Sequence, residues 1–109
     1  MKRGDVVLLV AQGDMGKPRP GVIVQADELG DTTNSILVCP MSSDVTEFHQ
    51  LRPVVEPSVT NGLRLRSQIM TDKMIPLRHD RIRRTIGRID RETSERLDRA
   101  LLVVLGLAQ

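Results

Sequence analysis

The side chains best suited to chemistry in this 109-residue chain are arginines, and they are unevenly distributed. Residues 1–63 hold five Lys/Arg against eight Asp/Glu, whereas residues 64–109 hold eleven against six. All but one of the cations in residues 64–88 are arginine. The planar guanidinium fork matches two oxygens of a phosphate or a carboxylate. This clustering indicates a nucleic-acid or acidic-protein partner, although a solvated basic surface would have the same composition.

The other groups that could react are two histidines and one cysteine. His49 and His79 are the obvious acid/base candidates, but they lie in different segments and we interpret them as surface residues. Cys39 stands inside an apolar run, so we expect it in the core, and it has no partner for an internal disulfide. No spacing of His, Cys, Asp and Glu resembles a closed metal site. We therefore expect neither a metal ion nor a cofactor.

The composition predicts a folded protein without a membrane segment. Hydrophobic residues make up 39% and charged residues 28% of the chain, which is typical of a globular protein. The apolar runs are much shorter than the roughly 20 residues that span a bilayer. The N-terminus lacks the organisation of a signal peptide, and a lone cysteine suits a reducing compartment. We expect one cytoplasmic domain over residues 1–109, with no membrane association.

The elements that must position these side chains are mostly short β-rich segments separated by polar turns. Strands are predicted over residues 5–11, 19–25, 35–41 and 51–55, with further short pieces at 74–77 and 83–89. Gly87 is a candidate bulge in the last of them. The stretches 12–18, 26–34 and 42–49 are predicted to be loops.

Residues 63–69 show the clearest strand pattern, because polar and apolar side chains alternate there. Alternation with a period of two is typical of a strand with one buried face. Ser67 is the only break in the pattern. The apolar face would carry Leu63, Leu65 and Ile69, and the solvent-facing side would carry Arg64, Arg66 and Gln68.

The C-terminal segment changes to a helical period. Its apolar residues fall at i, i+3, i+4, i+7 and i+8, which predicts an amphipathic helix; they are Leu97, Ala100, Leu101, Val104 and Leu105. Asp90 is a suitable N-cap, and Gly106 is expected to end the helix. Many short strands followed by one helix predict an α+β fold, a small β-barrel with a C-terminal amphipathic helix.

Four stretches, taken in order, resemble the MazF/PemK (Kid) family of toxins. They are Lys2–Val6 (KRGDV), Gly16–Val24 (GKPRPGVIV), Val38–Ser43 (VCPMSS), and Leu65–Asp72 together with the helix ending Val104–Leu107. The resemblance covers essentially the whole chain. It implies an SH3-like barrel and a homodimer that cleaves single-stranded RNA at short sequence motifs, with mRNA, rRNA and tRNA as candidate targets. It also implies inhibition by a cognate antitoxin with an acidic, partly disordered tail.

The resemblance also implies which residues form the site. The family's catalytic arginine falls on Arg19, and its catalytic threonine or serine falls on Ser42. The predicted RNA-binding residues are Lys17, Ser43, Arg64, Arg66 and Gln68. Many family members have threonine where this chain has Ser42. The arginine and aspartate of the Kid-type acid/base pair fall on Leu65 and Ser67, so that pair is missing.

RNA can be cleaved without a metal because its own 2′-hydroxyl attacks the adjacent phosphorus. A protein must then hold the in-line geometry and stabilise the charge that develops on the phosphorane. Arg19 suits that role, and it could also protonate the leaving oxygen. A guanidinium stays protonated in proteins, so Arg19 is unsuited to be the general base, which stays unassigned. The hydroxyl of Ser42 would donate to a non-bridging oxygen.

Two alternatives to an active ribonuclease stay open at this point. One is a CcdB-like toxin, which shares the fold but blocks DNA gyrase without catalysis. Such proteins act through C-terminal residues, typically with a tryptophan nearby. This chain has no tryptophan, and it keeps the motifs that contain Arg19 and Ser42. The other alternative is an RNA-binding barrel that has lost its activity.

Overall fold

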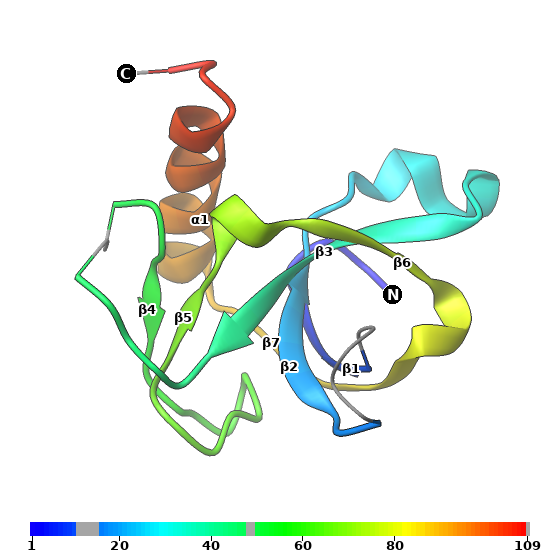
Figure 1. Ribbon diagram of the computed structural model, residues 1–109, viewed down its shortest axis with the longest axis horizontal. Helices are drawn as coiled ribbons and strands as arrows, with labels where there is room; N and C mark the ends of the chain where they lie inside the picture. The colour runs from blue at the N-terminus through cyan, green and yellow to red at the C-terminus, as the bar shows by residue number, and fades with distance from the viewer. Residues whose placement is uncertain (11–15, 48–49, 109) are drawn as a thin grey trace.

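The computed structural model describes residues 1–10, 16–47 and 50–108. Within them, seven strands form an antiparallel sheet that curls into a half-barrel, and one α-helix follows the last strand (Figure 1). The strands are β1 (Asp5–Leu9), β2 (Arg19–Ile23), β3 (Ser35–Ser42), β4 (Val54–Val55), β5 (Ser67–Ile69), β6 (Ile75–Arg78) and β7 (Ile82–Arg88). The connections include three short 3-10 helices, η1 (Asp27–Thr32), η2 (Thr71–Lys73) and η3 (His79–Arg81), and the α-helix α1 spans Arg91–Val104. The predicted α+β class, with a small barrel-like sheet and a C-terminal helix, is confirmed.

The central strand of the sheet is β3. The strands follow the order β4-β5-β3-β2-β1-β7, and β6 also pairs with β3. Residues 35–38 of β3 pair with β6, whereas its last two residues, Met41 and Ser42, pair with β5. The end of β3 therefore belongs to a small sub-sheet formed with β4 and β5, which lies beside α1 in Figure 1.

The core is divided between the two faces of the sheet. Alternation along β1 shows this, because Val6 packs into one cluster and Val7 into the other, and both are fully buried. The cluster around Val6 includes Leu97 of α1, so the helix covers that face. The cluster around Val7 includes Leu77 of β6 and lies on the opposite face. With both faces covered, β-branched residues can occupy successive positions of the strand.

The helix begins and ends where the sequence predicts. The Asp90 carboxylate accepts a hydrogen bond from the backbone N–H of Thr93 at 2.8 Å, and this bond holds the pKa of Asp90 below its ordinary value. Gly106 follows the helix with a φ of +74°, a conformation that favours glycine. Leu97 and Ala100 are fully buried, as predicted, but the prediction that Leu105 lies on the buried face is wrong, since it is 55% exposed. In the described part of the chain, no helix is long and apolar enough to cross a membrane.

A bulge occurs at the predicted place in β7. Val6 pairs with Gly87 but Val7 pairs with Thr85, so Ile86 is an extra residue in the register. A Cβ atom on Gly87 would lie 2.3 Å from the carbonyl oxygen of Thr60. Only glycine lets the turn before β5 approach β7 this closely.

The strand predicted over residues 63–69 is wrong in length and, for two of its residues, in orientation. As predicted, Leu63 and Ile69 are buried, and Arg64 and Arg66 are exposed. Only residues 67–69 form a strand. The Ser67 hydroxyl donates to the Leu65 carbonyl at 2.9 Å, which turns the chain before the strand begins. Leu65 is 63% exposed, whereas Gln68, expected on the solvent face, is fully buried. Two further predictions were imprecise: the strand at 51–55 is reduced to β4, and the loop at 26–34 contains η1.

Candidate active site

Arg19 and Ser42 lie at the same end of two neighbouring strands. Arg19 is the first residue of β2, and Ser42 is the last residue of β3. The two strands are antiparallel, and their last bonded pair at this end is Gly21 with Pro40. Arg19 lies two residues before Gly21, and Ser42 lies two residues after Pro40. Because side chains two residues apart share a face of a strand, both point to the face of Gly21 and Pro40. The structure brings both residues predicted to be catalytic to one end and one face of the sheet.

Gly21 sets the position of β2 against its neighbours. A Cβ atom at this residue would lie 2.5 Å from Leu9 Cδ2 and 2.9 Å from Val38 Cγ1. Real Cβ atoms essentially never approach so closely, so a larger residue would push β2 away from β1 and β3. Because Arg19 is only two residues away, a shift of β2 at Gly21 would also move the backbone that carries Arg19.

The hydroxyl of Ser42 is already oriented by the chain that follows it. Its oxygen accepts a hydrogen bond from the backbone N–H of Asp44 at 3.1 Å, an arrangement that turns the chain after β3. A hydroxyl has two acceptor sites and one hydrogen to donate. The hydrogen bond from Asp44 occupies an acceptor site only, so the hydroxyl hydrogen can still be donated to a ligand.

Gln68 lies opposite Ser42 on β5 but has no access to solvent. Its side-chain oxygen accepts hydrogen bonds from the backbone N–H of Thr46 at 3.0 Å and from the Thr46 hydroxyl at 3.3 Å. Its Nε2 is buried and has no hydrogen-bond partner in the described part of the chain. The prediction that Gln68 faces solvent is wrong, because the segment after β3 folds over this face. Alternation along a strand reports which residues share a face, but it cannot report what covers that face.

The remaining predicted RNA-binding residues are exposed at or near the same end of the sheet. Lys17 precedes β2, and Ser43 follows β3. Arg64 and Arg66 precede β5, which runs antiparallel to β3, so they lie toward the end of β3 that carries the candidate serine. Arg66 Nε forms an ion pair with Glu56 Oε1 at 2.8 Å. Arg64 forms no ion pair in the described residues.

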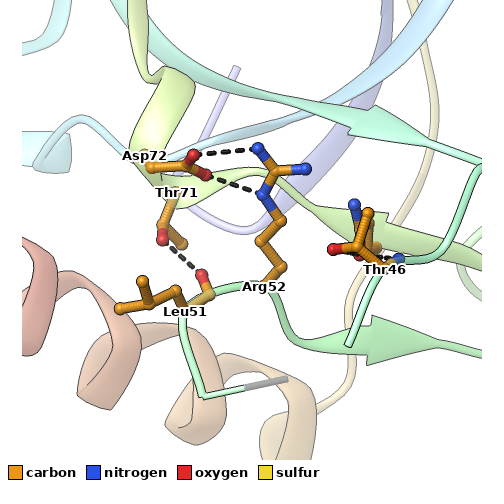
Figure 2. Close-up of polar contacts among 6 residues, drawn as sticks. Thr46, Leu51, Arg52, Thr71 and Asp72 are labelled. Atoms are coloured by element: carbon orange, nitrogen blue, oxygen red, sulfur yellow. Dashed lines mark hydrogen bonds and ion pairs between the residues drawn. The ribbon is translucent and has the colours of Figure 1, made fainter. Parts of the chain in front are cut away.

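Sequence reasoning missed a set of polar contacts that tie the chain before β4 to the segment after β5. Figure 2 shows the Arg52 guanidinium facing the Asp72 carboxylate, with two hydrogen bonds of 2.8 Å. The same figure shows the Thr71 hydroxyl donating to the carbonyl of Leu51. The hydrogen bond from Arg52 holds the pKa of Asp72 below its ordinary value. These partners are 20 residues apart, so no local pattern could have indicated the contacts.

Of the other candidate reactive groups, His79 lies away from this end. His79 directly follows Arg78, which pairs with Ser35 at the start of β3. β3 has 8 residues, so at about 3.3 Å per residue the chain runs about 23 Å along the strand from its start to Ser42. His49 falls outside the described residues. Cys39 is fully buried, and burial raises the pKa of its thiol to about 12, so the thiol stays neutral and unreactive. Among the described residues, no group of three or more His, Cys, Asp and Glu is arranged to hold a metal ion.

Comparison with known proteins identifies relatives along the full length of the chain. Residues 2–105 match the model of the PemK-like, MazF-like toxins of type II toxin–antitoxin systems. A probable endoribonuclease MazF of Mycolicibacterium smegmatis is 38% identical over 109 residues, which is 99% of both chains.

Solved structures share the same fold. The Mycobacterium tuberculosis toxin MazF-mt6 superposes with a TM-score of 0.82 at 18% identity, covering 96% of this chain and 99% of that one. A mycobacterial endoribonuclease in complex with its cognate antitoxin gives a TM-score of 0.83 at 19% identity, with 100% and 98% coverage. At these sequence identities the solved structures establish the fold. The family match and the relative at 38% identity establish the family membership. The chain belongs to the family of PemK-like, MazF-like toxins of type II toxin–antitoxin systems.

Proposed function

We propose that this protein cuts single-stranded RNA at selected sequences by directing the RNA's own 2′-hydroxyl at the adjacent phosphorus, without a metal ion. As a MazF-like toxin, it is an endoribonuclease of a toxin–antitoxin system. The observation that carries the finer proposal is the convergence of Arg19 and Ser42 at one end and one face of the sheet. We propose that residues 1–109 act as a single cytoplasmic domain.

Transesterification accounts for the chemistry with few protein groups. The 2′-oxygen attacks the phosphorus in line with the 5′-oxygen, its proton passes to a base, and a phosphorane with extra negative charge forms. The bond from phosphorus to the 5′-oxygen then breaks, and that oxygen takes up a proton. The products are a 2′,3′-cyclic phosphate and a free 5′-hydroxyl. The protein's main tasks are alignment and charge stabilisation.

Arg19 and Ser42 are suited to stabilise the negative charge that develops on the oxygens of the scissile phosphate. The guanidinium of Arg19 can donate two parallel hydrogen bonds to phosphorane oxygens, and it can donate a proton to the leaving 5′-oxygen. Because the guanidinium is already protonated, it is unsuited to remove the 2′-hydroxyl proton, so another group is the base. The Ser42 hydroxyl, held on its acceptor side by Asp44, would donate its hydrogen to a non-bridging oxygen.

The exposed groups around this end would bind the neighbouring nucleotides. Lys17, Arg64 and Arg66 would contact phosphates, and Ser43 would add a hydroxyl next to the catalytic serine. In the described conformation Gln68 cannot touch RNA, because it is fully buried beneath the segment that carries Thr46. Direct contact with RNA, as the family resemblance implies, would require that segment to move.

The proposed protein partners are an acidic antitoxin and a second copy of the chain. A related mycobacterial endoribonuclease is known in complex with its cognate antitoxin. Clustered arginines in residues 64–88 suit an acidic partner. Apolar side chains are exposed along the end of α1, namely Leu102, Val103, Leu105 and Leu107. A surface of this kind supports burial against a second copy.

The test uses purified protein, a single-stranded transcript and a DNA of the same sequence, all in EDTA. The RNA should be cut and the DNA should stay intact, because DNA lacks the 2′-hydroxyl. The new ends should carry a 2′,3′-cyclic phosphate and a 5′-hydroxyl. A 5′-phosphate end would refute the mechanism, and so would activity that is lost in EDTA and restored by Mg²⁺. Binding of RNA without any cleavage would instead support an inactive RNA-binding barrel. No observation favours the gyrase-blocking alternative.

A further inference from the structure

The segment between β3 and β4 is tied to the β5–η2 region near both of its ends. Near its start, Thr46 donates two hydrogen bonds to the buried side-chain oxygen of Gln68. Near its end, Arg52 forms its two-bonded contact with Asp72 (Figure 2). The segment begins directly after Ser42. Its conformation therefore determines how the candidate catalytic hydroxyl is presented.

A chain of contacts leads from Gln68 back to that hydroxyl. The side-chain oxygen of Gln68 accepts a hydrogen bond from the backbone N–H of Thr46 at 3.0 Å. Two residues earlier, the backbone N–H of Asp44 donates to the oxygen of Ser42 at 3.1 Å. If Thr46 were released, the turn that carries Asp44 would lose the side-chain hydrogen bonds that tie it to β5. The Ser42 hydroxyl could then rotate away from the direction in which it can donate to a phosphate.

The two ends of the Gln68 amide differ in their hydrogen bonding. Gln68 is fully buried, and its Nε2 has no hydrogen-bond partner in the described residues. Burying an amide donor without a partner is unfavourable, and an apolar side chain of similar size would avoid this cost. The part of the side chain that has partners is the oxygen that holds Thr46. The contacts thus favour a role in shaping the segment after Ser42.

The other end of the segment has a matching restraint. The side chain of Arg52 is only 14% exposed, and its guanidinium donates both hydrogen bonds to Asp72. Thr71, the residue before Asp72, donates to the Leu51 carbonyl. Two contacts on successive residues fix both the side chain and the backbone at the entry to β4.

We propose that Gln68 and Asp72 are positioning residues for RNA cleavage, and that they act by holding the segment after Ser42 from its two ends. This inference rests on the proposed function, because it assumes that Ser42 contacts the scissile phosphate. It assigns Gln68 an indirect role in place of the direct RNA contact implied by the family resemblance. Asp72 has the same kind of role at the far end of the segment.

The first experiment replaces Gln68 with methionine, which fills similar space without polar atoms. The kcat should fall about 10-fold to 100-fold, because a displacement of about 1 Å at a reacting group can cost about 100-fold. The Kd for RNA carrying a 2′-deoxy sugar at the mapped cleavage position should change less than about threefold, since no RNA contact is lost. The melting temperature should change little, because the loss of the two hydrogen bonds from Thr46 opposes the removal of the unpaired amide donor. Thr46→Ser keeps both donors to Gln68 and should keep the wild-type kcat.

The second experiment compares Asp72→Asn with Asp80→Asn. Asp80 pairs with Arg78 at the same 2.8 Å distance, but both side chains are exposed and lie at the opposite end of β3. Asp72→Asn should lower kcat about tenfold at unchanged Kd, and Asp80→Asn should leave both constants unchanged. Circular dichroism of each variant verifies folding.

The outcomes separate this inference from the proposed function. Wild-type protein that does not cut RNA in EDTA would refute the function and the inference together. If the wild type cuts and Gln68→Met has a normal kcat, only the positioning role is refuted. A weakened Kd with a normal kcat would show that Gln68 contacts RNA directly, which also overturns the inference.

Discussion

Replacing Gly21 with alanine tests whether this glycine places Arg19. The added Cβ would lie 2.5 Å from Leu9 Cδ2, whereas ordinary van der Waals contacts measure 3.4–4 Å. The Leu9 and Val38 side chains, or the strands that carry them, must therefore shift by up to about 1 Å, and overpacking of this kind costs about 1–3 kcal/mol. For a chain of about this size, each kcal/mol lowers the melting temperature by about 4–8 °C. We expect a fall of about 5–20 °C.

The same displacement should impair catalysis beyond its effect on stability. A shift of about 1 Å in Arg19 is expected to lower kcat by up to about 100-fold, measured well below the melting temperature so that all molecules are folded. Thermal unfolding followed by circular dichroism and cleavage of a mapped RNA give the two quantities. Thr85→Ala is the matched control, because Thr85 pairs with Val7 as Gly21 does, but it is exposed.

A second substitution distinguishes the steric clash at residue 21 from other effects of Gly21→Ala. Leu9→Val removes the nearest clashing atom, so Gly21→Ala combined with Leu9→Val should lose less stability than the sum of the single variants. A Gly21→Ala protein with unchanged melting temperature and unchanged kcat would refute the reasoning about strand spacing. A destabilised protein with full kcat would refute the link between Gly21 and Arg19.

Three further predictions concern the site, the ion pair and the partners. Arg19→Lys should lose about 10²–10³ in cleavage rate, nearly as much as Arg19→Ala, because a lysine ammonium cannot donate as a two-pronged fork. Ser42→Ala should lose less of the cleavage rate, and replacing either histidine should leave the rate nearly unchanged. An inactive histidine variant together with an active Arg19→Ala protein would contradict this order. The stability that Asp72 adds over Asp72→Asn should be complete at pH 5–7 and should shrink as the pH falls below 3.8, since its pKa is lowered in the folded protein; equal melting-temperature differences at pH 7 and pH 3 would argue against it. Sedimentation should show a dimer at micromolar concentration, and antitoxin binding measured by calorimetry should weaken as salt rises; a monomer or salt-independent binding would count against these proposals.

Local patterns in the sequence were enough to predict the elements that depend on near neighbours. The β-branched runs predict β1, β2 and β3 because their residues suit a pleated, buried surface. Asp90 and Gly106 predict both ends of α1, since a cap is formed by groups within a few residues of each other. The candidate pair Arg19 and Ser42 was recognised from short motifs. Each member lies at the end of a strand whose antiparallel register then brings the two to one end of the sheet.

Only the tertiary structure decided what covers each face and which distant groups meet. The alternating pattern in residues 63–69 correctly placed Gln68 and Ile69 on opposite faces of the strand. It could not show that the segment with Thr46 buries the face that carries Gln68. The contact between Arg52 and Asp72 likewise depends on pairing between β4 and β5, which closes a loop of chain between them. Alternation and capping are properties of a few consecutive residues, whereas burial depends on chain that returns from elsewhere in the sequence. The residues proposed to be catalytic could therefore be named from the sequence, whereas the contacts proposed to position them required the tertiary structure.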